Sequence, residues 1–371
     1  MHIKPFQALY PRMEFISSPD EFFGAIKEDF GGFNDHTLFH RPGRRSLFVY
    51  RITNAAGSFS GLLASVDIRD FLEGHIRKHE FTLEVKEQKQ MELMLRRRAA
   101  IKPVLLAYHR AEVVSDWIAR YTEGRAPTFE ASFLEGQERH TFWEASSPAD
   151  IEEAQRLFEA YVPTAYIADG HHRTASAARM HALAMQGKLP ESFSQLFCAF
   201  FPSSDIEILA FNRVVEGLNG HTPGSLLVAL SEYCEVEVMA KPEKPAHKHE
   251  LSMLLDKKWY RLCWKPALLQ LHAHEPAVLD ASLLNEVVLQ KILGLTDVRS
   301  CSRLSYVEGP KGLDGLCMHV EGCTECVAFC LYPIQLEEVI LMADNARALP
   351  PKSTWFEPRM KNGLVMQLIE D

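Results

Sequence analysis

One short segment of this chain combines residue types that can hold a phosphate. An apolar run, YIA, ends at Asp169 and Gly170 and continues into a helical pattern whose first turn contains His171, His172 and Arg173. Free backbone N–H groups and the positive end of the helix dipole favour an anion at such a turn. Gly170 lets a ligand approach the backbone, and Arg173 can fork onto phosphate oxygens. The alternative is an Asp-Gly turn with surface histidines, because strand–turn–helix units are common.

A second segment carries a candidate general base. Residues 73–88, EGHIRKHEFTLEVKEQ, place His79 and Glu80 in a loop ahead of a predicted helix. A glutamate beside a histidine could accept a proton in catalysis. The alternative is a charged helix N-terminus exposed to water.

The carboxylate of Asp169 could in addition hold Mg²⁺, which prefers oxygen ligands, or orient a histidine.

A third segment, PPKSTWFEPR, lies near the end of the chain at residues 350–359. Lys352, Ser353 and Thr354 could contact a phosphate or a carboxylate, while Trp355 and Phe356 anchor the segment. The alternative is a simply packed C-terminus, because buried aromatic side chains alone can tie down a terminus.

The cysteines are a further candidate for chemistry. Without an export signal, the eight cysteines are expected to be thiols. Cys317, Cys323, Cys326 and Cys330 have a spacing that a structural zinc or an iron–sulfur cluster would use. The segment CVAFCLYPI, however, is typical of a buried strand, in which Cys326 and Cys330 share one face and pack as small hydrophobic residues. Whether these four bind metal stays open.

Composition limits the class of protein. The chain has 371 residues, of which 47% are apolar and 24% charged, which excludes disordered, collagenous and coiled-coil proteins. A formal charge of −9 argues against a global basic field for nucleic acid or an anionic membrane. The start, MHIKPFQALY, lacks a signal pattern, and no apolar stretch approaches a membrane span. We therefore expect a soluble cytoplasmic protein.

The elements around the first two candidate segments alternate between strand and helix patterns, which predicts an α/β (α+β) fold. The expected helices span 84–98, 149–161 and 171–187, the last ending at a left-handed cap on Gly187. The expected strands of this first sheet span 46–52, 61–68, 103–108, the run up to Asp169, 195–201 and 206–215.

Loop-forming residues in EGLNGHTP, at 216–223, indicate the start of a second α/β unit. Its expected helices span 223–234, 248–256, 280–294 and 334–347, and its expected strands are EVEVM, WYRLCW, 304–307 and CVAFCLY. We predict a core over 1–216, a second domain over 217–347, and a C-terminal segment over 348–371 that packs on the active site. No Walker-type or kinase-type glycine motif is present in the sequence.

Several of these segments resemble one known family. ADGHHRTASA, LPPKSTWFEPRMKNGLV, IKPF and EGHIRKHEFT together look like the domain of unknown function (DUF) family ten-fifteen, over nearly the full length. That family is similar to the free-serine kinases, and through them to the ParB and sulfiredoxin superfamily. The similarity to the kinases rests on HE followed by a helix and KPVLLA, then DGHHR, then PKST, in that order. It implies a ParB/sulfiredoxin-like nucleotide-binding core with insertions, and a tail that returns to the site.

The resemblance also implies roles for individual residues. Glu80 corresponds to the catalytic glutamate that takes the proton from the substrate hydroxyl, and Ser353 replaces the first threonine of a Pro-Lys-Thr-Thr piece that closes over the substrate. The predicted catalytic residues are Glu80, His171 and Asp169, and Mg²⁺ is expected at Asp169. The predicted phosphate-binding residues are Gly170, His172, Arg173 and Thr174. The predicted substrate-binding residues are His79, Lys352, Ser353 and Thr354.

The leading hypothesis is therefore a small-molecule kinase that transfers phosphate from ATP or ADP to a hydroxyl of free serine or a related metabolite. The alternative is a nucleotide-binding regulator of the ParB-like superfamily without turnover. A sulfiredoxin-like activity ranks last, because it needs a cysteine beside the turn. The expected partners are a nucleotide and a hydroxyl-bearing metabolite, with no membrane or nucleic acid and with a homodimer possible. The acceptor, the choice of nucleotide, the metal and the role of the middle domain stay open.

Overall fold

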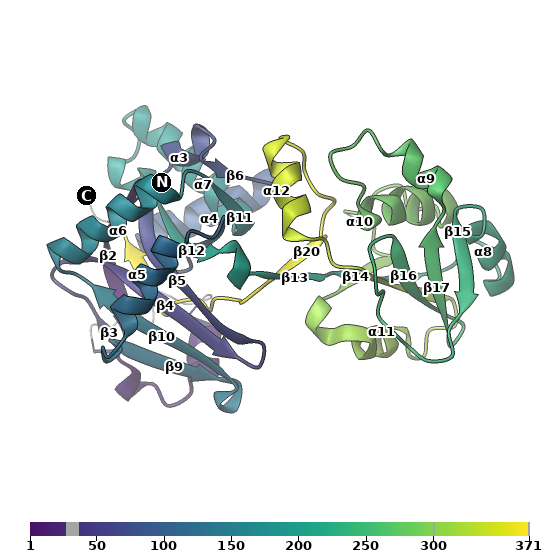
Figure 1. The fold of residues 1–371 in the computed structure, drawn as a ribbon, viewed down its shortest axis with the longest axis horizontal. Helices are drawn as coiled ribbons and strands as arrows, with labels where there is room; N and C mark the ends of the chain where they lie inside the picture. The colour runs from purple at the N-terminus through teal and green to yellow at the C-terminus, as the bar shows by residue number, and fades with distance from the viewer. Residues whose placement is uncertain (27–36, 300, 370–371) are drawn as a thin grey trace. The chain divides into compact units, whose positions relative to one another are not determined.

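The computed structural model describes residues 1–26, 37–299 and 301–369. The chain forms two compact units (Figure 1). The first comprises Met1–Ile206 and the C-terminal segment from Pro358, and the second comprises Glu207–Glu357. Residues 207–216 and 348–357 are therefore counted with the second unit, and the residues from 358 onward with the first.

A large mixed sheet forms the centre of the first unit. Among the described residues it has 13 strands, and its main path runs β6-β11-β8-β12-β5-β4-β2-β21-β7. β12 and β8 are parallel, as are β11 and β6, whereas β8–β11, β12–β5 and β4–β5 are antiparallel. The main strands are β4 Arg45–Asn54, β5 Gly57–Asp67, β6 Ile76–Arg77, β8 Val104–Tyr108, β11 Ala165–Asp169 and β12 Gln195–Pro202.

Shorter strands extend this sheet. They are β1 Ile3–Lys4, β2 Phe6–Pro11, β3 Phe39–His40, β7 Ala99–Ala100, β9 Phe129–Phe133, β10 Glu138–Ala145 and β21 Met366–Leu368. β9 and β10 form a hairpin that pairs with β4 through β10. β21 pairs with both β2 and β7, so the end of the chain is part of the first unit's sheet.

Helices pack on this sheet through regularly spaced apolar residues. On α5 the side chains of Val114, Trp117, Ile118 and Tyr121 are buried at helical spacing. The α-helices are α1 Pro19–Ala25, α3 Arg69–Leu72, α4 Glu84–Arg97, α5 Glu112–Thr122, α6 Pro148–Tyr161 and α7 His171–Met185. Short 3₁₀ turns are η1 Met13–Phe15, η2 Leu134–Gly136, η3 Glu191–Ser194 and η4 Ser203–Asp205. The predicted helices at 84–98, 149–161 and 171–187 are confirmed.

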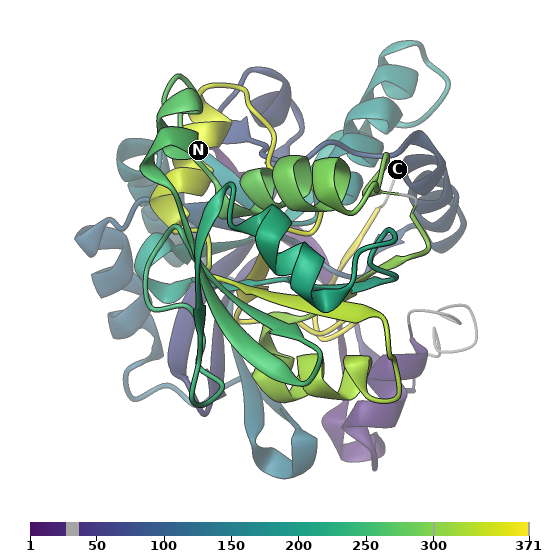
Figure 2. The same ribbon diagram turned by 90° about the vertical axis from the view of Figure 1, so that its right-hand side faces the viewer.

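The second unit contains a sheet whose hydrogen-bonded pairs are all antiparallel among the described strands, in the order β15-β17-β16-β19-β14-β18 (Figure 2). These strands are β14 Asn212–Glu216, β15 Cys234–Val238, β16 Glu250–Leu255, β17 Lys258–Trp264, β18 Leu304–Val307 and β19 Cys326–Leu331. A separate two-stranded ribbon joins β13 Glu207–Ala210 to β20 Thr354–Glu357.

Two apolar clusters cover the two faces of this sheet. Val215, Met253 and Leu255 belong to one cluster, whereas their neighbours Val214 and Leu254 belong to the other, as the alternation along a strand requires. The helical segments are α8 Pro223–Leu230, α9 Pro266–Leu271, α10 Asp280–Leu283, the π-helical turn η5 Leu284–Ile292, the 3₁₀ turn η6 Gly309–Lys311, α11 Gly312–Val320 and α12 Leu336–Asp344.

Two element predictions are wrong. The run 206–215 is not one strand that completes the first sheet, because it divides at Phe211 into β13 and β14, which both belong to the second unit. The segment 248–256 is not a helix but the strand β16, all six residues of which are buried. A strand covered on both faces shows no alternation, so its pattern is indistinguishable from that of a buried helix segment.

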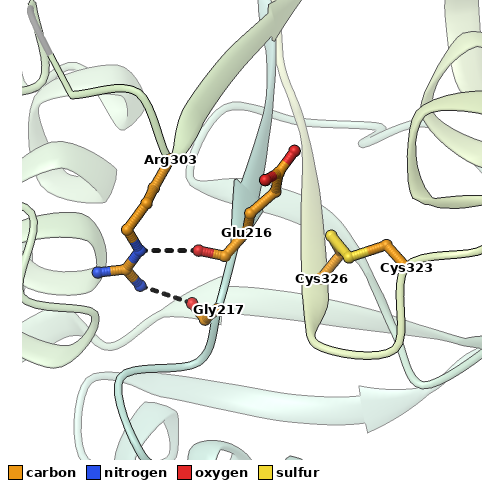
Figure 3. The surroundings of a disulfide bond; sticks show 5 residues. All are labelled: Glu216, Gly217, Arg303, Cys323 and Cys326. Atoms are coloured by element: carbon orange, nitrogen blue, oxygen red, sulfur yellow. Dashed lines mark hydrogen bonds between the residues drawn. A yellow bond between two sulfur atoms is a disulfide. The ribbon is translucent and has the colours of Figure 1, made fainter.

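The prediction that all cysteines are thiols is also wrong. Cys323 and Cys326 form a disulfide at the start of β19 (Figure 3). Cys330 is a buried thiol, as the strand pattern predicts. The sequence spacing C-x-x-C allows a disulfide as well as a metal site, and only the positions of the two side chains distinguish these outcomes.

Candidate functional site

The DGHHR segment forms the expected turn between a strand and a helix. β11 ends at Asp169 and α7 begins at His171, with Gly170 between them at a φ of +116°. A Cβ on Gly170 would lie 2.9 Å from the Arg173 guanidinium, so this turn requires glycine for both its backbone angle and its space. The first backbone N–H groups of a helix lack intrahelical partners and can bind an anion.

Asp169 is the centre of a charged cluster. Its Oδ2 accepts a hydrogen bond from Nη2 of Arg173 at 2.7 Å and lies 3.2 Å from Nζ of Lys102. Burial opposes ionisation of Asp169, but Arg173 and Lys102 outweigh it and hold the pKa of this carboxyl well below its ordinary range. Burial also lowers the pKa of Lys102, and the neighbouring Asp169 counteracts that effect.

The cluster has an excess of positive charge. Lys102 and Arg173 carry two formal positive charges against one on Asp169, and Arg359 adds to the stabilisation of the Asp169 carboxylate. The side chain of Asp169 is 42% exposed, so solvent reaches the cluster. Together with the positive end of the α7 dipole, this charge balance suits an anionic group such as a phosphate.

Arg173 makes structural contacts within the protein, and its contact with a phosphate stays a prediction. Besides its bond to Asp169, its Nη1 donates to the backbone oxygens of Lys102 at 3.2 Å and Pro103 at 2.6 Å. Both terminal nitrogens are therefore engaged by protein oxygens, and the guanidinium connects the start of α7 to the residues that precede β8. Thr174 is likewise turned inward, because its buried hydroxyl donates to the oxygen of Gly170.

The two histidines of the motif hold the loop that carries Glu80. Nε2 of His171 accepts the backbone N–H of His79 at 3.4 Å. Nε2 of His172 accepts the backbone N–H of Leu83 at 3.2 Å. The loop is thus bound to the first turn of α7 at both of its ends, with Glu80 between them.

Glu80 lies beside the turn as a result. Its Oε2 is 3.9 Å from Nδ1 of His171, and its side chain is 43% exposed. Burial lowers the pKa of His171 to about 3, so the ring is neutral at pH 7. Because Nε2 accepts the N–H of His79, the proton of the neutral ring is assigned to Nδ1, which faces Glu80.

His79 is buried against His171. The two rings are 4.4 Å apart in an edge-to-face arrangement. Burial, with a smaller contribution from His171, lowers the pKa of His79 well below its ordinary value. His79 is 2% exposed, so its packing is directed into the protein. A contact between His79 and a substrate stays a prediction.

Lys102 is the residue that sequence reasoning left out of the site. Its Nζ lies 3.2 Å from Oδ2 of Asp169, and only Pro103 separates it from the strand β8. The signal that could have identified it is its place in KPVLLA, where a lysine stands immediately before a buried strand in a segment already used for the family resemblance.

The third predicted segment belongs to the second unit up to Glu357 and to the first unit from Pro358. Lys352 lies over the ring of Phe211, with Nζ 5.1 Å from the ring centroid. The hydroxyl of Ser353 donates to the oxygen of Pro350 at 2.7 Å, and Thr354 begins β20 opposite Ala210. Their participation in the site around Asp169 stays a prediction.

Among the residues that the structure describes, none form a resident metal site. Within the described ranges, no group of three or more histidine, cysteine, aspartate or glutamate side chains is arranged to hold a metal ion. Asp169 contributes one carboxylate, and its Oδ2 is engaged by two cationic groups. Binding of Mg²⁺ at Asp169 stays a prediction, and no chemical step is assigned to it below.

A cavity lies in the first unit at the opposite end of α7. Its volume is about 580 Å³, and its lining includes His181, Met185, Arg45 and Gln367. No predicted site residue lines this cavity in the described part of the chain. Over the same part, no helix is long and apolar enough to span a bilayer.

Comparison with known proteins finds one family. A family model described as "Protein of unknown function (DUF1015)" matches residues 9–285. Among curated proteins, none matches the chain in sequence.

Three solved structures are distantly similar. SbnI with a C-terminal truncation, from Staphylococcus aureus, has a TM-score of 0.42 and 12% identity, covering 81% of this chain and 85% of that one. A free serine kinase in complex with AMP has a TM-score of 0.37 and 13% identity, covering 81% and 92%. A conserved hypothetical protein from Pyrococcus furiosus has a TM-score of 0.38 and 14% identity, covering 82% and 95%.

Proposed function

Because the chain belongs to the DUF1015 family of proteins of unknown function, we propose an activity from the geometry of its own residues: a small-molecule kinase that transfers phosphate from ATP or ADP to a hydroxyl of free serine or a related metabolite. The observation that carries this proposal is that the two histidines in the first turn of α7 also hold the loop of Glu80. A carboxylate that can accept a proton is thereby held beside a group of positive charges.

In this proposal the nucleotide phosphates bind at the first turn of α7. The backbone N–H groups of His171 and His172 and the ammonium of Lys102 face the phosphate oxygens, while Arg173 keeps the turn in place. Phosphoryl transfer needs positioning and charge neutralisation more than covalent help from the protein, and this set of groups supplies both.

Glu80 is proposed to act on the acceptor. The substrate hydroxyl oxygen forms a bond to the terminal phosphorus, the bond from that phosphorus to the leaving nucleotide oxygen breaks, and the hydroxyl proton passes to the Glu80 carboxylate. The neutral His171, with its proton on Nδ1, directs the carboxylate without competing for the proton. Lys352, Ser353 and Thr354 are proposed to contact the substrate, on the basis of the family resemblance alone.

The test is a transfer assay on the full chain. Purified protein is incubated with Mg²⁺, ATP or ADP, and hydroxyl-bearing metabolites that include L-serine, and products one phosphate heavier are detected by mass spectrometry. Glu80→Gln should keep nucleotide affinity and lose turnover by roughly 10²-fold or more, the contribution expected of a general base. Glu84→Gln is the matched control, because that glutamate is 82% exposed and pairs only with Arg179 among the ion pairs described.

One outcome would contradict the kinase, and another would contradict the role of Glu80. If no acceptor is phosphorylated although nucleotide raises the melting temperature, the protein is a nucleotide-binding regulator without turnover. If Glu80→Gln abolishes nucleotide binding together with turnover, Glu80 maintains the binding site and is not the proton acceptor.

A further inference from the structure

The second unit contains a pair of cysteines whose two sulfur atoms differ in accessibility. Cys323 is exposed, whereas Cys326 is 7% exposed and begins the strand β19. They are three positions apart and joined as a disulfide, at the end of the pair β14–β19 (Figure 3). An exposed sulfur in a C-x-x-C pair is open to attack by a thiolate from outside.

The disulfide is not needed to hold its turn. The backbone N–H of Cys323 donates to the oxygen of Val320 at 3.1 Å, and the oxygen of Glu325 accepts the N–H of Gly217 at 2.7 Å. A bridge between residues only three positions apart also restricts the unfolded chain little, because the stabilisation grows with the length of the closed loop. The turn should therefore keep its backbone conformation when the disulfide is reduced.

The adjoining strand end is held independently of the sulfur atoms. Arg303 donates from Nε to the oxygen of Glu216 at 2.8 Å and from Nη2 to the oxygen of Gly217 at 2.7 Å. In Figure 3, Arg303 and the disulfide lie on opposite sides of Glu216. Opening the disulfide consequently leaves the register of β14 and β19 intact.

We propose that Cys323 and Cys326 form a reversible thiol–disulfide exchange site whose reductant is a dithiol. A thiolate of the dithiol attacks Sγ of Cys323, the bond between the two cysteine sulfurs breaks, and Cys326 leaves as a thiolate that takes up a proton. The second thiol of the reductant then attacks the reductant's first sulfur, which is bonded to Sγ of Cys323 in the mixed disulfide. This attack releases Cys323 as a thiolate, which takes up a proton. Two electrons and two protons pass to the protein, and the dithiol becomes a disulfide.

The charge around the pair selects the reductant. Glu216 stands opposite Cys326 in the strand register. Glu321 lies two positions before Cys323, Glu325 lies between the two cysteines, and all three glutamates are exposed. Anionic monothiols such as glutathione are repelled by these carboxylates, and the repulsion is screened by salt. A neutral dithiol is not repelled, and its second thiol completes the reaction within the mixed disulfide.

The first test is a redox titration of the full chain in graded mixtures of reduced and oxidised dithiothreitol, followed by maleimide labelling and intact mass spectrometry. Two labels should appear together with the slope of a two-electron couple, while the circular dichroism of the folded protein is retained. Cys317→Ser is the control, because Cys317 is an exposed single thiol in the described structure and its loss should leave the paired transition unchanged. Labels that appear only after the protein is unfolded would overturn the proposal, and so would a pair that stays reduced at every mixture.

The second test separates the two sulfurs. Two single variants are labelled with maleimide in their folded state. Cys326→Ser retains the exposed Cys323, and Cys323→Ser retains the buried Cys326. The retained Cys323 should be labelled at least about tenfold faster than the retained Cys326, because labelling requires access to the sulfur. Reduction of the wild-type pair by glutathione should accelerate about threefold or more from low to high salt, and reduction by dithiothreitol should change little. Equal labelling of the two cysteines, or salt effects of equal size, would overturn the assignment.

Discussion

At the level of single residues, Arg173 has structural contacts that its position in the sequence does not reveal. An arginine in the first turn of a helix is a good candidate for a phosphate ligand. Here its terminal nitrogens donate to Asp169 and to the backbone oxygens of Lys102 and Pro103. It therefore fixes Asp169 and the segment that carries Lys102.

This role predicts that Arg173→Lys is destabilising although the charge is kept. A lysine cannot reach three acceptors with a planar fork, so at least one buried carbonyl loses its donor, at a cost of about 2 to 3 kcal/mol. Urea unfolding measures the change. Arg179→Lys on the same helix is the control, because Arg179 is 38% exposed, donates to no buried carbonyl among the contacts described, and pairs with the exposed Glu84 and the partly buried Glu87, with which a lysine can also pair. Equal costs for the two variants would show that the Arg173 contacts are not important for stability.

At the level of elements, the contact between α7 and the loop ahead of α4 decides where Glu80 lies. The loop donates two hydrogen bonds to the helix from its backbone N–H groups, at His79 and Leu83, and the ring of His79 packs against the ring of His171. Ser176 adds a further bond from α7 to the oxygen of Glu87 on α4. Histidine suits the receiving positions because a neutral ring offers one acceptor nitrogen on a rigid frame.

The same contact predicts a loss of stability in mild acid. The pKa of His171 is about 3 in the folded protein, against an ordinary value of 6.5. Between these two pH values the unfolded chain binds more protons than the folded protein, so stability is complete above pH 6.5 and falls as the pH is lowered. From pH 6.5 to pH 5 this one residue should account for a loss of about 2 kcal/mol.

Urea unfolding at pH 6.5 and pH 5 of the wild type and of His171→Gln checks this prediction. Glutamine can still accept the N–H of His79 but does not titrate, so the variant should lose about 2 kcal/mol less than the wild type on acidification. The same loss in both proteins would mean that His171 is protonated in the folded state.

Elements also differ in how well their patterns reveal them. The helix at Pro148–Tyr161 has Ala154, Leu157 and Phe158 on one buried face, and its position is evident from the sequence. The strand β16 has both faces buried, so its periodicity does not distinguish it from a helix. The strands β13 and β14 follow one another in one apolar stretch, so the sequence pattern predicts a single strand. Patterns identify an element when one face meets water and the other does not.

At the level of the whole molecule, the chain leaves its first unit and returns to it. The second unit is one continuous segment, Glu207–Glu357, whereas the first needs residues from both sides of it. The returning strand β21 places Met366 opposite Leu9 and Gln367 opposite both Ala8 and Ala100. The first unit is consequently incomplete without the end of the chain.

This arrangement predicts different behaviour for the two units when they are expressed alone. The fragment 207–357 should fold cooperatively, because it has its own sheet and its own apolar clusters. The fragment 1–206 should not, because it lacks β21, and fusing 358–371 to it through a flexible glycine-serine linker should restore a cooperative thermal transition. Circular dichroism melting compares the three proteins. A fragment 1–206 that melts like its fused counterpart would show that β21 adds nothing to the unit.

The sequence by itself determined the α/β class, the family, the strand–turn–helix character of DGHHR and the identity of Glu80 as a candidate base, because these depend on local patterns and on the order of short motifs. Only the tertiary structure decided that His171 and His172 accept hydrogen bonds from the Glu80 loop, that Arg173 is engaged by protein oxygens, that Lys102 joins Asp169 and that Cys323 pairs with Cys326. These facts depend on the distances between side chains and their partners in the folded protein. Residue types and spacing restrict the partners that are possible, and the packing of the folded chain selects among them.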